Sequence, residues 1–363
     1  MRRIHLFLLC AAGLLAVAAC NEFQTAGQTG TLSLVVVEGG APSTKASGTT
    51  ELSYEKKIND LQIFIFEGET LFRYDRVTQG LGTLPYSRNF GSVKAGAYRV
   101  WAVANAPDLS DVTTEEELAS AAVYLTDCGL TDAEGFVMAG SGDALVSNGS
   151  AATASVPLTR FAARVRLVSV TNEVPETYAG AGAVTVQSVF LVNALGTWNL
   201  GGYGTASEWV NLGGREAGSQ ASNNPGDFIS SEDQVNPSEY LEHVYRTEAA
   251  QIANGATHSF SNCCLYSFPN DVSDDHTGNS ATLSSGALTR LVVLATVNGE
   301  DWWYPVTLFK NGHGLERNTS YDVRLTFRAT GSDDPNEPVG KGDLSAVVSV
   351  RAWESGAEYN ETI

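Results

Sequence analysis

Short stretches of this 363-residue chain alternate apolar side chains with polar or smaller ones, which is the pattern of β-strands with one buried face. The alternation is clearest at residues 61–66, 161–167 and 321–328, and the last two stretches carry charged side chains on one face. Further strands are expected at 98–104, 184–193, 291–297, 304–309 and 345–353. Strands with one wet face are typical of antiparallel sandwiches and not of a parallel sheet covered by helices.

Two local patterns add detail to this all-β picture. Thr113 and Glu116 form a capping-box pattern, so one helix is predicted at residues 114–123. Trp302 and Tyr304 would share one face of a strand with Trp303 on the other, so at least one ring must pack inward. Core packing is therefore favoured over a sugar-stacking platform.

The start of the chain reads as a targeting segment. Arg2 and Arg3 precede an apolar run at 4–19 that is too short for a transmembrane span, so residues 1–19 are predicted to be a secretory signal peptide. Small residues precede Cys20, as in a bacterial lipobox, and cleavage there would leave Cys20 as an acylated N-terminus. Several acyl chains make a durable membrane anchor. The alternative is that Cys20 merely ends an ordinary signal.

A complete strand pattern lies just after this segment. Leu32, Leu34 and Val36 form the apolar face of a strand at 31–37, and the small, polar stretch 39–50 follows it as a predicted exposed linker. Proteases cut such linkers preferentially, so the strand at 31–37 lies upstream of a cleavable segment. A second break at 173–182, together with the chain length, indicates two domains with a boundary there.

Composition and charge narrow the function classes. Hydrophobic residues make up 43% and charged residues 17%, which fits a globular chain and excludes a disordered one. The net charge of −19 repels nucleic acid, so no nucleic-acid partner is expected. Cys10 leaves with the signal and Cys20 would carry lipid, and the remaining Cys128, Cys263 and Cys264 are expected to be buried free thiols.

Motifs of catalysis or metal binding are not found in the sequence. Gly-x-Ser-x-Gly, His-Glu-x-x-His, phosphate-loop and zinc-type Cys-x-x-Cys patterns do not occur. The histidines beyond the signal stand singly, and the acidic run 271–275 lacks the spacing of a calcium loop (His243, His258, His276 and His313; Asp271, Asp274 and Asp275). We therefore expect no enzyme activity, no cofactor and no bound metal.

Several segments together resemble a known family. Residues 58–66, 95–106 and 158–165 are similar to the N-terminal domain of the Bacteroidales major fimbrial subunit (fimbrillin) family, and 315–323, 331–338 and 350–353 are similar to its last strands. The resemblance implies two transthyretin-like antiparallel β-sandwich domains, with the short helix in the first. The implied parts are a signal peptide (1–19), a propeptide with a removable strand (20–45), an N-terminal domain (46–176) and a C-terminal domain (177–363).

The resemblance also implies how the protein matures. A family member is exported as a lipoprotein precursor to the outer membrane, and a protease specific for arginine or of trypsin type then removes the N-terminal strand. Here the scissile bond would join Lys45 to Ala46, where family members usually carry arginine, so cleavage by an arginine-only protease is in question. Residues 1–45 hold three basic and two acidic side chains, so the mature part carries a net charge of −20.

The same resemblance suggests how subunits join. The removable strand, with Leu32, Leu34 and Val36, would leave a groove that a strand from the next subunit fills. The expected donor has Leu344, Ala346, Val348 and Val350 as its apolar face, with the polar tail 354–363 trailing; within the monomer the same strand closes its own sheet.

The function that follows is a structural subunit of adhesive cell-surface fimbriae, stalk or tip. Its expected partners are other fimbrial subunits, outer-membrane lipid through Cys20 before cleavage, the processing protease and a host receptor. The alternative is a lipid-anchored, glycan-binding surface lipoprotein that never polymerises. Retention of the lipid on Cys20 in the mature form would favour that alternative.

Overall fold

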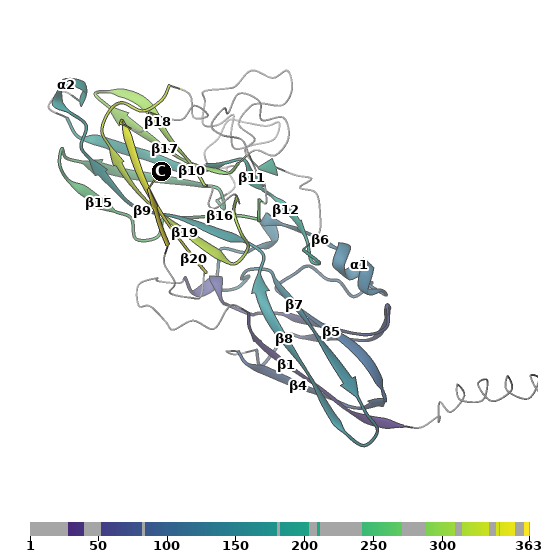
Figure 1. The fold of residues 1–363 in the computed structure, drawn as a ribbon. Coiled ribbons are helices and arrows are strands. Elements are labelled where there is room, and N and C mark those ends of the chain that lie inside the picture. The colour runs from purple at the N-terminus through teal and green to yellow at the C-terminus, as the bar shows by residue number, and fades with distance from the viewer. Residues whose placement is uncertain are drawn as a thin grey trace, which may run out of the picture.

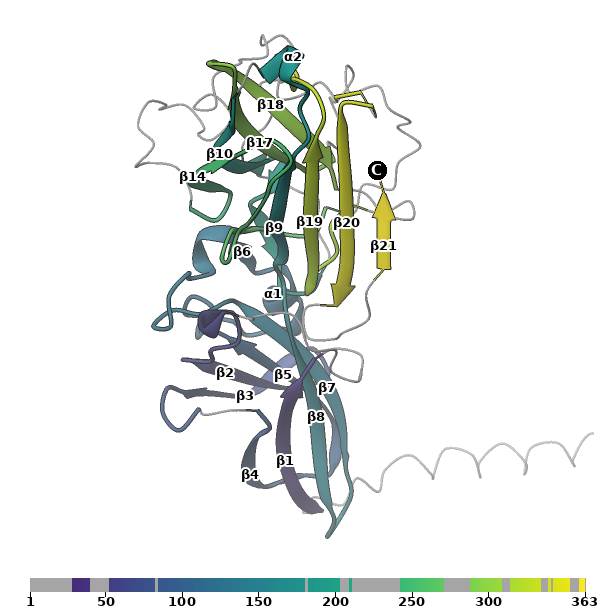
Figure 2. The ribbon, with the colours of Figure 1, turned by 90° about the vertical axis from the view of Figure 1, so that its left-hand side faces the viewer.

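The computed structural model consists almost wholly of β-strands arranged in two lobes stacked end to end (Figures 1 and 2). It describes residues 28–39, 52–81, 84–179, 182–202, 209–210, 242–270, 288–308, 314–333, 339–340, 342–352 and 359–362. The expectation of an all-β fold with a short helix is confirmed. The sheets are mixed and not purely antiparallel, because Thr29–Glu38 pairs in parallel with Ala151–Arg160 and Ala163–Asn172 pairs in parallel with Thr319–Phe327.

The N-terminal lobe, residues 29–160, is a seven-stranded sheet folded over on itself, with the order β3-β2-β5-β7-β8-β1-β4. Its strands are β1 (Thr29–Glu38), β2 (Leu61–Glu67), β3 (Thr70–Val77), β4 (Tyr86–Lys94), β5 (Gly96–Ala104), β7 (Met138–Val146) and β8 (Ala151–Arg160). The strands β7 and β8 pair only at Met138–Ala139, and then separate. The layer β8-β1-β4 therefore lies against the layer β3-β2-β5-β7, with the apolar side chains of both between them.

The C-terminal lobe, residues 163–362, contains two larger sheets that face each other. One has the order β14-β10-β17-β18 and the other β15-β9-β19-β20-β21, with β16 also on β9. The strands are β9 (Ala163–Asn172), β10 (Val184–Val192), β14 (Tyr245–Ile252), β15 (Thr257–Ser259), β16 (Cys264–Ser267), β17 (Arg290–Val297), β18 (Glu300–Thr307), β19 (Thr319–Phe327), β20 (Leu344–Ala352) and β21 (Tyr359–Thr362).

Short strand pairs complete the fold, and the first of the two joins the lobes. The strand β6 (Ala122–Tyr124) pairs with β12 (Thr197–Asn199), and β11 (Ala194–Leu195) pairs with β13 (Trp209–Val210). The described helices are α1 (Glu115–Ser120) and α2 (Glu176–Ala179), and the described 3₁₀ turns are η1 (Ser53–Glu55) and η2 (Leu125–Asp127). Buried residues of both lobes form one continuous core.

The strand pairing favours an earlier boundary between the lobes than the expected one after residue 176. The chain passes directly from β8 to β9, and every strand that pairs with β9 (β15, β16 and β19) comes from the later part of the chain. A boundary after residue 176 would separate β9 from these partners. We therefore propose the boundary between Arg160 and Ala163.

The helix prediction is right in type but needs a correction at both ends: α1 stops at Ser120, and the predicted helical residues 122 and 123 belong to the strand β6. Helix α1 begins one residue later than expected, because Thr114 and not Thr113 is the N-cap: its hydroxyl accepts from the backbone N–H of Glu117. The reciprocal partner is the carboxylate of Glu117, which also accepts from Thr113, and not that of Glu116. Three successive glutamates follow two threonines here, so the sequence alone did not fix the register of the cap.

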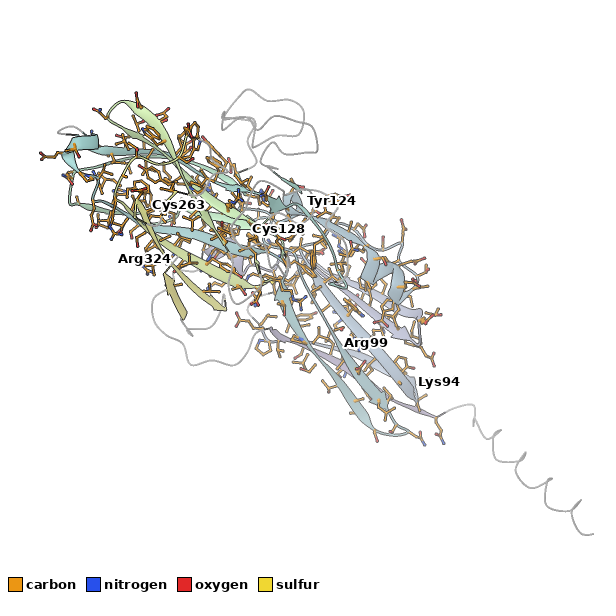
Figure 3. The ribbon with its side chains drawn as sticks, turned by 45° about the horizontal axis from the view of Figure 1, so that its top comes forward. Lys94, Arg99, Tyr124, Cys128, Cys263 and Arg324 are labelled. Carbon is orange, nitrogen blue, oxygen red and sulfur yellow. The ribbon has the colours of Figure 1, made fainter. Side chains whose placement is uncertain are left out.

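The aromatic and cysteine predictions are confirmed. Trp302 and Tyr304 pack on the main core, whereas Trp303 packs on a smaller apolar cluster on the other face of its sheet. Cys128, Cys263 and Cys264 are buried and free, and burial raises the pKa of the Cys128 thiol to about 12. Figure 3 shows Cys128 near the meeting of the lobes and Cys263 within the C-terminal lobe.

Candidate functional site

The strand β1 lies inside its layer, between two other strands (Figure 2). It pairs antiparallel with β4 over eight residue pairs and parallel with β8 over eight more. We call the space that β1 fills between β4 and β8 the β1 groove. Because β1 is hydrogen-bonded on both sides, its removal would leave two open strand edges and not one.

The apolar face of β1 points into the lobe. Leu32, Leu34 and Val36 are each fully buried in the main core, whereas Ser33, Val35 and Val37 on the other face are half-buried. Burying each large apolar side chain contributes about 1.5–3 kcal/mol relative to leaving it exposed. The groove is thus an apolar channel as well as a pair of hydrogen-bonding edges.

Glycines mark both ends of β1, at points where backbones approach closely. A Cβ added at Gly30 would lie 2.5 Å from the carbonyl oxygen of Ser147 and 2.6 Å from that of Ser150. A Cβ at Gly39 would lie 2.2 Å from Oγ1 of Thr159 and 2.7 Å from the carbonyl oxygen of Leu158. Side chains therefore fit between these two positions but not at them.

The C-terminal lobe contacts the end of the groove where Gly39 lies. The backbone N–H of Gly39 donates to the carbonyl of Leu158 (2.8 Å), and Nδ2 of Asn318 donates to the carbonyl of Gly39 (3.3 Å). Oδ1 of Asn318 accepts in turn from Arg160 (3.3 Å). The strand β1 is thereby tied to both lobes.

The chain on the far side of the expected linker is held by a buried ion pair. Glu55 accepts from Arg164 (2.7 Å) and from the hydroxyl of Tyr266 (2.8 Å), and Arg160 donates to the backbone carbonyl of Glu55. Glu55 and Arg164 are both fully buried. Burial disfavours the charge of Arg164, but Glu55, Cys264 and Tyr266 together outweigh it, so the pKa of this guanidinium lies above its ordinary value. Residues 52–57 are thus fixed to the C-terminal lobe independently of β1.

The expected donor strand lies in the C-terminal lobe, next to the last strand of its sheet. It corresponds to β20, which pairs with β19 over nine residue pairs and with β21 over four (Figure 2). Leu344, Ala346, Val348 and Val350 are buried in the core of their own lobe. The outer strand β21 is described only as a partner of β20, at Val347–Val350.

Other predicted positions fall outside the described residues. These are Cys20, Lys45 and Ala46, and also His276, His313 and the aspartates at 271–275. His243 is buried and donates through Nε2 to the carbonyl of Cys128, whereas His258 is exposed on β15. Within the described ranges no group of three or more His, Cys, Asp or Glu side chains is placed to hold a metal ion. No helix among them is long and apolar enough to cross a membrane.

A cavity of about 510 Å³ lies where α1 and β5 meet the C-terminal lobe, lined in part by Arg99, Trp101, Glu115 and Arg317. Glu115 accepts from Nε1 of Trp101 (2.8 Å) and lies 3.4 Å from Nε of Arg99. Oε1 of this carboxylate is therefore held by both neighbours.

Sequence reasoning missed Glu55, Arg164 and Asn318. Glu55 and Arg164 are 109 positions apart, and Asn318 and Gly39 are 279 apart. A lone glutamate before a strand gives no local signal of an ion pair. The alternating arginines at 164 and 166 were the one sequence signal of charged partners. The alternation predicts a solvent-exposed face for them, and this prediction is wrong for Arg164, which is buried.

These features define a class of protein: an all-β, two-lobed chain with an N-terminal strand enclosed between two others. Residues 30–184 match the model of the family described as "Major fimbrial subunit protein (FimA)". The resemblance to the Bacteroidales major fimbrial subunit family is therefore confirmed over this N-terminal part of the chain. No curated protein matches the chain in sequence.

Solved structures show the same fold over almost the whole chain. A fimbrilin from Porphyromonas gingivalis is 13% identical with a TM-score of 0.58, covering 91% of this chain and 99% of its own. A candidate cell adhesion protein from Bacteroides eggerthii is 19% identical with a TM-score of 0.57, covering 90% and 97%. A tip fimbrial protein from Porphyromonas gingivalis is 12% identical with a TM-score of 0.50, covering 90% and 100%. The fold is therefore shared with a fimbrilin and with a tip fimbrial protein.

Proposed function

We propose that this protein is a non-catalytic structural subunit of adhesive cell-surface fimbriae, and that it polymerises when β1 is removed and a C-terminal strand of another subunit replaces it. The observation that carries the proposal is the position of β1, enclosed by β4 and β8 with Leu32, Leu34 and Val36 fully buried. The family match and the fimbrilin fold support it.

The maturation steps belong to the same proposal. Lipid on Cys20 would hold the precursor at the outer membrane, and a cut between Lys45 and Ala46 would separate β1 from the rest of the chain. The released form then keeps residues 52–57 in place, because Glu55 is held by Arg164 and Tyr266 and not by β1. Its partners would be other fimbrial subunits, the processing protease and a host receptor.

The emptied groove explains why assembly would follow the cut. Two open strand edges and an apolar channel form the template that strand addition satisfies. A C-terminal strand from a second copy gives a head-to-tail contact that does not close on itself, and therefore a filament. The tail is the natural starting point, since β21 pairs with β20 over only four residue pairs.

Polymerisation of trypsin-cut protein tests the proposal. The wild type should form detergent-resistant ladders on a gel, and deletion of residues 355–363 or the double change Val348→Asp and Val350→Asp should abolish them. Val347→Asp is the matched control, because Val347 lies on the half-buried face of β20. Circular dichroism must show that each variant is folded. Long ladders from folded, cut, tail-deleted protein would show that the C-terminal donor is wrong.

A further inference from the structure

At the end of the β1 groove where Gly30 lies, one position accepts only glycine. Gly30 is buried, and a Cβ there would meet the carbonyl oxygens of Ser147 and Ser150 at 2.5 and 2.6 Å and a methyl group of Val146 at 2.6 Å. Two of these three atoms belong to the backbone, which cannot move aside as a side chain can. Any strand that fills the groove in the register of β1 must therefore carry glycine at this position.

The segment that contains β20 repeats the sequence of β1. Residues 30–38 read Gly-Thr-Leu-Ser-Leu-Val-Val-Val-Glu, and residues 342–350 read Gly-Asp-Leu-Ser-Ala-Val-Val-Ser-Val. Five of these nine positions are identical, and both segments place a glycine two residues before the first inward leucine. Leu344, Ala346 and Val348 thereby correspond to Leu32, Leu34 and Val36.

The glycine at 342 has no role in its own lobe that would require glycine. Gly342 is exposed, a Cβ built on it would meet nothing within 4 Å, and its φ lies outside the left-handed range. An alanine would fit there without strain. Glycine is therefore required at the Gly30 position of the groove, but it is not required where Gly342 lies in its own lobe.

We propose that β20 of a neighbouring subunit enters the groove in one register, with Gly342 at the position of Gly30 and Leu344 at that of Leu32. This inference rests on the proposed strand exchange and adds its register and the residue that selects it. The outward residue Ser345 then takes the position of Ser33, opposite Asn89 of β4.

The same register explains why β1 is the better occupant of the groove. Ala346 fills less of the space that Leu34 fills, and Arg351 would fall at the position of Gly39, where a Cβ lies 2.2 Å from Oγ1 of Thr159. The donor must leave the groove before that point. The hydrogen bond from Asn318 to Gly39 then belongs to β1 alone. Exchange therefore requires that β1 first be cut away.

The decisive variant is Gly342→Ala in the full chain, cut with trypsin. We expect the melting temperature of the uncut monomer to stay unchanged and ladder formation to slow at least about tenfold, which corresponds to about 1.4 kcal/mol. Gly340→Ala is the matched control: it adds the same methyl group outside the matching segment, and its Cβ contacts only the flexible carboxylate of Asp343. It should polymerise like the wild type.

Cysteine cross-linking reads the register directly. Ser345→Cys combined with Asn89→Cys should give disulfide-linked ladders, whereas Val347→Cys with Asn89→Cys, two residues out of register, should not. Ladders that are linked through position 347, or that form equally fast in Gly342→Ala, would overturn the register and leave strand exchange intact. A cut wild type that forms no ladders would overturn the proposed function, and the register with it.

Discussion

At the scale of single residues, the buried pair of Glu55 and Arg164 should contribute far more to stability than an ion pair at the surface. Both side chains are fully buried, 2.7 Å apart, so loss of the carboxylate charge removes a buried counter-charge of the guanidinium. We expect Glu55→Gln to lower the free energy of unfolding by about 3 kcal/mol or more in urea titrations.

The control is Glu173→Gln. Its partner Arg328 lies 3.1 Å away, but both side chains are nearly half exposed. This change should cost no more than about 0.5 kcal/mol. Equal effects of the two variants would show that the buried pair does not fix residues 52–57.

His243 should make stability depend on pH. Burial lowers its pKa below the ordinary value, outweighing the bond to the carbonyl of Cys128 and the nearby Glu242 and Glu134, and Arg246 acts in the same direction as burial. As pH falls below about 6.5, the unfolded chain takes up the proton before the folded chain does, so stability decreases. The stability conferred by the neutral imidazole is thus present above pH 6.5, and it is lost as the pH falls toward the pKa of His243 in the folded protein.

Unfolding measured at pH 7.5 and 5.5 tests this. His243→Gln, whose Nε2 can donate to the same carbonyl, should reduce the difference in unfolding free energy between the two pH values, by no more than about 1.4 kcal/mol. His258→Gln, at an exposed position, should leave the difference as it is in the wild type. An unchanged difference in His243→Gln would contradict the role of burial.

At the scale of elements, β1 should matter to the precursor and not to the assembled form. Leu34 is fully buried and its neighbour Val35 points to the other face, so Leu34→Ala should cost about 2–5 kcal/mol in the uncut chain and Val35→Ala less than about 1 kcal/mol. In the proposed exchange β1 is absent from the polymer after cleavage, so ladders of the two cut variants should be equally stable to heating in detergent. A weaker ladder from Leu34→Ala would mean that β1 stays in the groove.

Alternation along the chain predicted some of the strands, because the two-residue period of side chains is a local property, but it did not predict β3, β4, β7, β8 or β14, and β4 and β8 enclose β1. It located β1, β2, β19 and the apolar face of β20, including the buried Leu32, Leu34 and Val36. It did not show that β9 pairs with β19, a parallel contact between segments more than 140 residues apart. The need for glycine at positions 30 and 39 likewise could not be predicted from the sequence, because it comes from atoms distant in the sequence that lie close to these two residues in the fold.

At the scale of the whole molecule, charge should control how fast cut subunits meet. The mature part would carry a net charge of −20, and like-charged subunits repel over about a Debye length, which is about 30 Å at 0.01 M salt and 10 Å at 0.1 M. The groove itself is apolar, and salt screens the approach of subunits without weakening the burial that follows. Raising sodium chloride from 10 to 150 mM should therefore speed polymerisation of cut protein several-fold, measured by light scattering. The uncut precursor, with β1 in its groove, should stay monomeric at both concentrations. Polymerisation that slows as salt is added would mean that attraction between charged groups, and not exchange into an apolar groove, joins the subunits.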